Sequence, residues 1–388
     1  MGPWTHGGFG RTRQGELDYP INALDTFSWE MFVEMIEEYA HDGSDDFDHR
    51  PNVSYYVMGD VDDEQAPGNT WRFAESWPVP YAERTWYFYS NGDLSTVGPD
   101  TVDSSRSFTY NPQDPVPTIG GQNLILPSGP YDQQEIENRG DVLVFTSEPL
   151  SMPYEATGPI KARLYVSSDC PDTDFTVKLT DVYPDGRSML ITDGILRMRN
   201  REGFDHWEFM EPGDIYEVEV DLWSTSYIWN TGHRIRVAVS SSNYPRFLNN
   251  PNTRDGIYQN EGNYNIAHNT VYVNNLYPSC LILPEVTSPL VAIIKPQDAL
   301  YLNNKEILAT LVPIAIGPIE IIADVYDIDD MVEQVLFYID NDVVDSFESE
   351  PYRYYWDGFS FGKHAVTVRV VDSSGTSAED ELVIWKFF

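Results

Sequence analysis

Strict alternation of apolar and polar residues fills the middle of this chain of 388 residues. Between positions 216 and 222, tyrosine, valine and leucine alternate with glutamate and aspartate, and similar runs occupy 160–166 and 234–239. Such period-two runs predict strands with one buried face. Turn signals such as Pro184-Asp185-Gly186 separate them, and no helical pattern intervenes between residues 52 and 284. We therefore expect this range to form a mainly β domain, a two-sheet sandwich of the jelly-roll type.

The C-terminal part shows a second β pattern. Residues 285–296 are typical of a linker, with Ser288-Pro289 at its centre, and residues 297–388 follow it. Asp340-Asn341-Asp342 has the composition of a hairpin tip, and the alternating valines of 366–370 predict another strand. An immunoglobulin-like β-sandwich is the architecture that this pattern favours.

Residues 1–51 differ from the rest because their clearest element is a helix. Apolar residues recur there at three- and four-residue spacing, and Asp25 or Thr26 can cap the start. The apolar stripe consists of Trp29, Phe32, Val33, Ile36 and Tyr39. A glycine-rich loop precedes it. One loop and one helix cannot bury a core, so we expect this segment to pack on another domain.

The net charge of −38 limits the partners. Nucleic-acid binding needs clustered lysine and arginine, so it is excluded. No apolar run approaches the ~20 residues that span a membrane. An acidic surface fits an extracellular or cell-surface protein, although an ordinary acidic surface explains it equally well. Cys170 and Cys280 could pair, which their spacing cannot decide, and neither has neighbours that suit a metal site. We expect no metal and no organic cofactor.

The string Gly2-Pro3-Trp4-Thr5-His6-Gly7 places a histidine in a glycine-flanked loop. An imidazole can act as a general base at neutral pH if a nucleophile and an orienting carboxylate are beside it. The string resembles the catalytic-histidine loop of serine hydrolases of the X-Pro dipeptidyl-peptidase, cocaine-esterase and α-amino-acid ester hydrolase type. That resemblance implies that His6 is the general base of a Ser-Asp-His triad.

Further strings resemble the non-catalytic β domain of the same family, and they occur in the expected order up to residue 284. They are Trp71-Arg72, Trp77-Pro78, 110–118, 139–143, 172–175, 181–187, 194–197, 232–236 and 241–246. The resemblance implies a galactose-binding-like jelly roll at 52–284 and makes residues 1–51 the remnant of an α/β-hydrolase domain. It does not extend past about residue 290.

The triad serine and aspartate of that family precede the histidine, yet only five residues precede His6. We therefore expect a truncated chain, or one whose α/β-hydrolase core is a separate polypeptide, and no activity from this chain alone. The implied function is hydrolysis of an ester or peptide bond through an acyl-enzyme. Within the β domain, His233, Arg234 and Arg236 are predicted to pair with Asp172 and Asp174. Asp172, Asp174 and Trp77 are also candidates for substrate contact.

Gly358-Phe359-Ser360-Phe361-Gly362 matches the G-x-S-x-G pattern of a nucleophile elbow, and His364 lies nearby. The elbow needs a helix after the serine, whereas 363–371 alternates as a strand. We therefore interpret this stretch as a loop before a strand. Similarly, the acidic residues of 324–330 and Asp340, Asp342 and Asp345 lack EF-hand spacing, which favours a solvated acidic face over a calcium site.

A second class of function stays open. Two β-sandwiches in series could form a non-catalytic module that binds carbohydrate or a cell-surface partner. The 25 tyrosines and 10 tryptophans could stack on sugar rings. The terminal sandwich could also serve only as an anchor or spacer.

Overall fold

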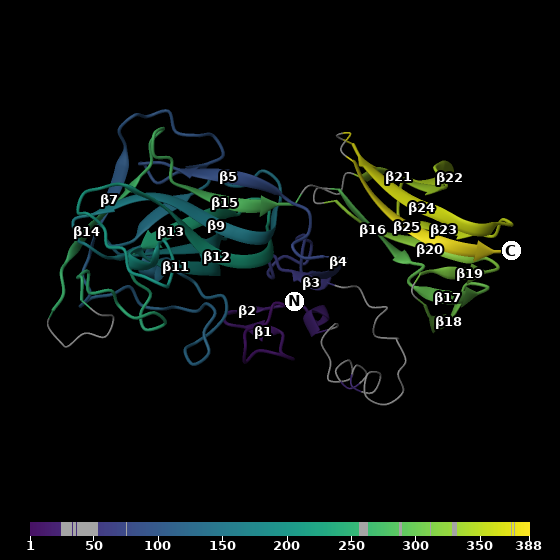
Figure 1. The fold of residues 1–388 in the computed structure, drawn as a ribbon, viewed down its shortest axis with the longest axis horizontal. Coiled ribbons are helices and arrows are strands. Elements are labelled where there is room, and N and C mark those ends of the chain that lie inside the picture. Colours follow the sequence, from purple (N-terminus) through teal and green to yellow (C-terminus); the bar gives the residue numbers. More distant parts are fainter. Residues whose placement is uncertain are drawn as a thin grey trace.

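The computed structural model describes residues 1–24, 33, 36, 53–74, 76–255, 263–286, 289–310, 312–327, 332–373, 375 and 377–388. Strands dominate these residues. Two β-sandwiches lie at opposite ends of an elongated molecule, and a short β ribbon lies between them (Figure 1). The prediction of a mainly β chain with two sandwiches is confirmed, whereas the unit boundaries given above stay predictions. None of the described helices is long and apolar enough to cross a membrane.

The larger sandwich consists of two antiparallel sheets. In the larger sheet the strand order is β6-β5-β15-β9-β14-β7, with β12 also paired to β9, and in the smaller it is β11-β10-β13-β8. The larger sheet contains β5 (Ala82–Phe88), β6 (Leu94–Ser95), β7 (Ser105–Tyr110), β9 (Tyr154–Ser168), β12 (Tyr216–Trp229), β14 (Ala267–Tyr272) and β15 (Cys280–Glu285). The smaller contains β8 (Leu143–Thr146), β10 (Asp174–Val182), β11 (Ser188–Arg197) and β13 (Arg234–Ser240).

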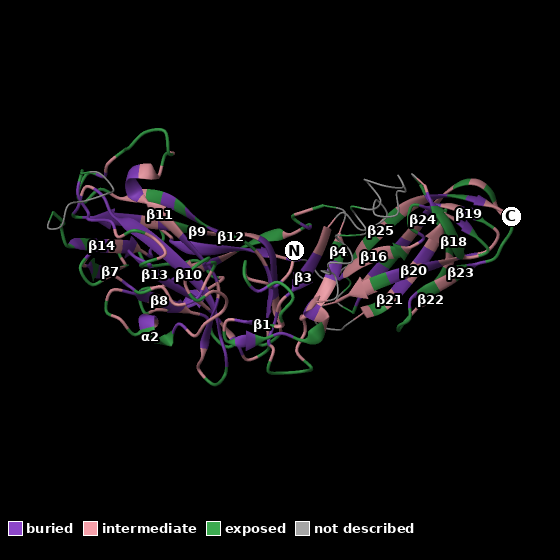
Figure 2. Ribbon diagram, turned by 90° about the horizontal axis from the view of Figure 1, so that it is seen from below, coloured by how far each residue is buried: buried purple, intermediate pink, exposed green. Residues whose placement is uncertain are grey.

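Alternation explains how these sheets face each other. Along β12, Val218, Val220 and Leu222 are buried, while the acidic residues between them are exposed. Because side chains alternate across a strand, the apolar set of each sheet points inward. The opposite set of β12 meets solvent, whereas that of β10 is also buried. Buried residues accordingly concentrate in the strands, while many residues of the connecting loops are exposed or intermediate (Figure 2). The predicted strands at 160–166, 216–222 and 234–239 are confirmed.

The terminal sandwich has its own core, which includes Phe337, Trp356 and the predicted valine strand. Its sheet orders are β16-β20-β23 and β18-β17-β19-β25-β24-β21-β22. The strands are β16 (Leu290–Lys295), β17 (Ala299–Leu302), β18 (Lys305–Ala309), β19 (Ile314–Ile316), β20 (Ile319–Tyr326), β21 (Val332–Ile339), β22 (Asp342–Phe347), β23 (Arg353–Trp356), β24 (Phe361–Asp372) and β25 (Ser377–Phe387). Asp340 and Asn341 have positive φ values of 50° and 72°, as a tight hairpin tip requires. The predicted tip is confirmed.

A two-stranded ribbon, β3 (Val53–Val57) and β4 (Thr70–Ala74), lies between the two sandwiches (Figure 1). Tyr55 pairs with Arg72 and Tyr56 with Trp71. One face of the ribbon, with Tyr56 and Trp71, packs in a cluster with N-terminal residues. The opposite face, with Tyr55, packs in a cluster that reaches Tyr326 of the terminal sandwich. Because side chains alternate across a strand, one face of the ribbon contacts the N-terminal residues and the other face contacts the terminal sandwich.

The N-terminal residues form a small separate structure. It contains β1 (Arg13–Gln14), β2 (Leu17–Asp18) and the 3₁₀ helix η1 (Ile21–Leu24). Most of the predicted helix and both of its candidate caps lie outside the described residues. Val33 and Ile36 are described, and both are helical and exposed.

Candidate functional site

The loop that carries His6 is held by one glutamine. The Gln14 side chain is buried, and its amide oxygen accepts a hydrogen bond from the Thr5 backbone at 2.9 Å. Its amide nitrogen donates to the carbonyls of Gly8 at 3.0 Å and Arg11 at 2.8 Å. The Gln14 side chain thus holds three backbone positions of the loop together and stabilises the conformation of the loop. His6 stands exposed at the tip.

A cavity of about 490 Å³ lies between this loop and the larger sandwich. The loop contributes residues 1–6, the ribbon contributes Tyr55 and Tyr56, and strands β11 and β12 contribute 189–193 and 224–227. Trp77, which the sequence singled out as a candidate for substrate contact, also lines it. The volume falls within the range of small-molecule sites. The histidine therefore stands at the mouth of a hollow that the β domain helps to form.

The structure does not complete a triad around His6 within the described residues. Ser224 and Ser226 line the same cavity, yet neither hydrogen-bonds His6, and the Ser226 hydroxyl pairs with Thr157 at 2.8 Å. A general base needs both a nucleophile and an orienting carboxylate within reach. The described residues of this site therefore supply one member of the three.

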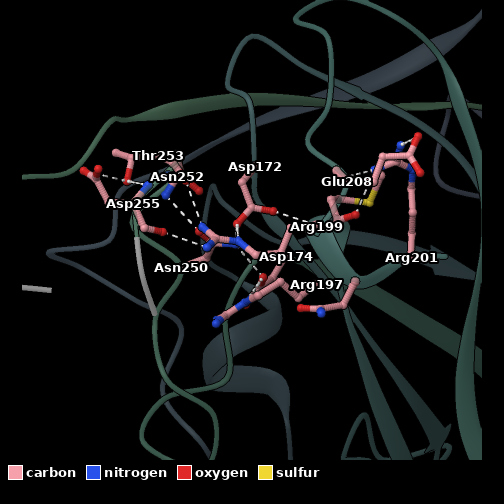
Figure 3. A network of polar contacts seen from close by, with 12 residues as sticks. Asp172, Asp174, Arg197, Arg199, Arg201, Glu208, Asn250, Asn252, Thr253 and Asp255 are labelled. Carbon is pink, nitrogen blue, oxygen red and sulfur yellow. Dashed lines mark hydrogen bonds and ion pairs between the residues drawn. The ribbon is translucent and has the colours of Figure 1, made fainter. Parts of the chain in front are cut away.

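The predicted partners of Asp172 and Asp174 are wrong. Asp172 accepts a hydrogen bond from Arg199 at 2.7 Å, and Arg197 grips Asp174 with two bonds of 2.8 Å (Figure 3). Asn250 donates to both carboxylates at 2.7 Å. The cause is register, because Asp174 lies directly opposite Arg197 in the β10–β11 pair. These buried carboxylates are engaged by the two arginines and Asn250, and they are not among the residues that line the His6 cavity.

The β13 cations have other partners. Arg236 pairs with Glu137 at 2.6 Å and Arg234 lies 3.9 Å from Glu148. His233 is buried between two carboxylates, with Asp181 at 2.9 Å from Nδ1 and Asp60 at 3.3 Å from Nε2. Burial lowers the pKa of His233, but hydrogen bonds to these carboxylates outweigh it and raise the pKa to about 9. This imidazolium is a structural cation.

The serine of the G-x-S-x-G pattern contacts His364, which the sequence placed nearby, and His364 contacts Asp340, which sequence reasoning missed. Ser360 precedes β24, so the interpretation as a loop before a strand is confirmed. However, its hydroxyl lies 2.6 Å from His364 Nε2, and His364 Nδ1 lies 2.6 Å from Asp340. Asp340 is 24 residues from His364, and only strand pairing brings the two together. The sequence signal that could have pointed to this contact is the predicted hairpin tip at Asp340-Asn341-Asp342.

Both cysteines are free and buried, so the pairing that the sequence left open does not occur. Burial raises the pKa of Cys170 to about 12 and that of Cys280 to about 11. Among the acidic candidates for calcium, Asp340 is engaged by His364, Asp324 is exposed, and Asp329 and Asp330 lie outside the described residues. No group of three metal-binding side chains occurs in the part of the chain that the structure describes.

These features define a two-sandwich protein that presents a histidine loop beside a cavity. Its sequence matches the X-Pro dipeptidyl-peptidase C-terminal non-catalytic domain over residues 45–282, and a bacterial Ig domain over 289–368. The chain belongs to the family of X-Pro dipeptidyl-peptidase C-terminal domains, with a bacterial Ig domain appended.

Relatives support the same assignment. Cocaine esterase of Rhodococcus sp. (strain MB1 Bresler) is 38% identical over 302 residues, which cover 73% of this chain and 50% of that protein. An α-amino acid ester hydrolase structure matches with a TM-score of 0.64 and 26% identity, over 74% of this chain and 49% of the other. An aminopeptidase from a marine-sediment Thaumarchaeota archaeon matches with a TM-score of 0.62 and 25% identity, over 71% and 47%. The chain therefore spans about half the length of these relatives.

Proposed function

We propose that this chain is the C-terminal portion of a serine hydrolase that cleaves ester or peptide bonds, with His6 as its general base. The observation that carries the proposal is the Gly2–Gly7 loop, which Gln14 fixes at the edge of a cavity walled by the family's non-catalytic domain. The likeness to an esterase, an ester hydrolase and an aminopeptidase supports this range of bonds.

In this mechanism an α/β-hydrolase core, joined to the chain or on a separate polypeptide, supplies the nucleophilic serine and the aspartate. His6 takes the proton from the serine hydroxyl as the serine attacks the carbonyl carbon, and it then protonates the leaving group. The aspartate holds the imidazole in the required tautomer. Without the serine, a triad loses on the order of a millionfold in kcat. The isolated chain should accordingly show no hydrolysis that depends on His6.

The test compares the 388-residue chain with the product of the same gene expressed together with any coding sequence that adjoins codon 1 in frame. Hydrolysis of 4-nitrophenyl esters reports esterase activity, and release of 4-nitroaniline from X-Pro anilides reports peptidase activity. His6→Ala should lower kcat by at least about 10³-fold. His268→Ala, at an exposed histidine paired with Asp169, is the matched control and should leave kcat unchanged. Equal activity of these two variants in an active, longer product would refute the role of His6.

A second candidate function, carbohydrate binding, is favoured by one observation on the terminal sandwich. Trp385 and Phe387 of β25 have rings 6.3 Å apart and nearly parallel, at 15°. Trp385 is 39% exposed, and Phe361, which packs on Phe387, is 69% exposed. Aromatic platforms of this kind can stack on sugar rings. We propose with it an extracellular or cell-surface location, which the acidic surface supports. Retention on an insoluble polysaccharide, lost in Trp385→Ala, would establish the binding.

A further inference from the structure

Ser360, His364 and Asp340 of the terminal sandwich form a continuous hydrogen-bonded row. The Ser360 hydroxyl lies 2.6 Å from His364 Nε2, and His364 Nδ1 lies 2.6 Å from Asp340 Oδ2. This is the order of a nucleophile, a base and an orienting carboxylate that activates serine for acyl transfer. The row lies in the Ig domain, in a different part of the chain from His6, and it takes no part in the function proposed above.

Strand pairing holds the row in place. Ile339 lies opposite Val366 in the β21–β24 pair, so the tip residue Asp340 comes beside the start of β24. The Ala365 backbone donates to Asp340 Oδ1 at 3.0 Å, and the Asp340 backbone donates to the Ala365 carbonyl at 2.9 Å. The carboxylate is thus fixed at one oxygen by the backbone and free at the other for the imidazole.

The imidazole is oriented and partly shielded. Its ring packs edge-on against Trp356, with centroids 5.3 Å apart, and the side chain is 15% exposed. The hydrogen bond to His364 lowers the pKa of Asp340, so the carboxylate stays charged and accepts the Nδ1 proton. Nε2 then faces the serine as an acceptor. A base in this tautomer is ready to take the hydroxyl proton.

We propose that Ser360 is a nucleophile toward activated esters, including carboxylic esters with good leaving groups and fluorophosphonates. Phe359 and Phe361 flank the serine with rings that are 79% and 69% exposed. Exposed aromatic rings on the two residues that adjoin the serine in sequence favour apolar acyl or aryl groups over charged ones. Ser360 is half-buried, so a small reagent can reach it.

The reaction with an ester forms a bond between Ser360 Oγ and the carbonyl carbon, while the hydroxyl proton moves to His364 Nε2. The bond from that carbon to the leaving oxygen then breaks, and the leaving group takes the proton from Nε2. Water hydrolyses the acyl-serine by the same route. With a fluorophosphonate, the new bond is O–P, fluoride departs, and the adduct is stable.

The strand that follows Ser360 limits the substrates. In a nucleophile elbow a helix follows the serine, and backbone N–H groups there stabilise the oxyanion. Here the strand β24 begins at Phe361, so no helix N-terminus follows the serine to supply those N–H groups. Loss of one oxyanion donor costs about 10²–10³ in kcat. The site therefore suits reagents with good leaving groups, which react without strong oxyanion stabilisation. Amide bonds, whose leaving groups are poor, are not expected to be cleaved.

The test treats the full chain with a fluorophosphonate–biotin probe and maps the adduct by mass spectrometry. We expect one adduct per chain, on Ser360, and none in Ser360→Ala. His364→Ala should slow labelling by about 10²–10⁴-fold, and added imidazole should restore part of the rate, which a merely structural role would not allow. Asp340→Asn should slow it by about 10-fold or more, since the tautomer is lost.

Controls separate this site from general reactivity and from misfolding. Ser346→Ala removes an exposed serine of the same sandwich, and His268→Ala removes an exposed His–Asp pair without a serine, so both should label at the parent rate. If His364→Ala lowers the melting temperature, His364→Gln replaces it. Absence of labelling in the folded parent chain overturns the proposal, as does labelling that persists in Ser360→Ala. Neither result bears on His6, which the hydrolysis assay above tests separately.

Discussion

The guanidinium carbon of Arg72 lies 3.4 Å from the centroid of the Tyr326 ring, so a cation of the ribbon covers an aromatic face of the terminal sandwich. The same guanidinium donates to both oxygens of Glu155, in the larger sandwich, at 2.9 and 3.0 Å. Both charged side chains are almost fully buried. One arginine therefore connects three parts of the molecule, and the two sandwiches meet through it.

Removal of this arginine should be costly. Arg72→Ala leaves the Glu155 carboxylate buried without its cation, and loss of one partner of a buried pair costs about 3–5 kcal/mol of the free energy of unfolding. Tyr326→Leu keeps the ion pair and loses the ring, so about 1–2 kcal/mol is expected. Denaturant unfolding measures both.

Arg163→Ala is the matched control for that series, because Arg163 lies 3.6 Å from Glu217 with both side chains well exposed. Exposed pairs contribute at most about 1 kcal/mol. If Arg72→Ala destabilised the protein no more than Arg163→Ala, the structural role of the buried pair would be refuted.

His233 should make stability depend on pH. Its pKa is raised to about 9 in the folded protein, against the ordinary 6.5. The folded state therefore holds a proton that the unfolded state has lost between these values. The stabilisation is fully present below about pH 6.5 and is lost as the pH rises through about 9, by up to about 3 kcal/mol. Unfolding free energies at pH 6, 7.5 and 9 measure the slope.

His233→Gln should flatten that slope, while His268→Ala, at an exposed histidine, should keep it. A variant series in which all three proteins have the same pH dependence would show that the Asp181–His233–Asp60 contact carries none of it.

Gln14→Ala should loosen the His6 loop without unfolding the sandwiches. The substitution removes the side chain that binds the backbone of Thr5, Gly8 and Arg11. Three hydrogen bonds at about 1 kcal/mol each predict amide exchange in residues 5–11 that is faster by at least about 10-fold. Gln65→Ala, at an exposed turn residue, is the comparison. Unchanged exchange in Gln14→Ala would mean that other contacts hold the loop.

The two thiols should resist alkylation until the protein unfolds. Both are buried, and burial raises their pKa values to about 12 and about 11, so little thiolate forms at pH 8. Iodoacetamide followed by intact mass should add nothing to the native chain and two groups after denaturation without reductant. A denatured chain that takes up no reagent would indicate a disulfide.

Local pattern predicted the parts of the fold that alternation controls. The valines and leucine of β12 and the valines of β24 that alternation places inward are buried, because a strand with one buried face has only one way to place its side chains. The hairpin tip at Asp340 was equally predictable, since asparagine and aspartate tolerate positive φ.

Partner choice was not predictable from local pattern, because it depends on which strands pair and in what register. Asp174 pairs with Arg197 rather than with β13, since β10 and β11 align those two positions. The Ser360 stretch was interpreted as a loop because no helix follows it, and the contact of His364 with Asp340 depends on the pairing of β21 with β24. The His6 loop was found through resemblance alone, and nothing in its spacing reveals Gln14 as its anchor.

The ribbon gives the terminal sandwich a mechanical consequence. Tyr55 and Arg72 face that sandwich, while Tyr56 and Trp71 face the N-terminal loop, where the Trp71 ring lies 5.7 Å from that of Trp4. The Tyr56 backbone also bonds the Met1 carbonyl at 2.9 Å. If the terminal sandwich were bound to a surface or polymer, a force on it would therefore pass through the ribbon to Trp4, two residues from His6. Such a force would act on the loop that borders the cavity.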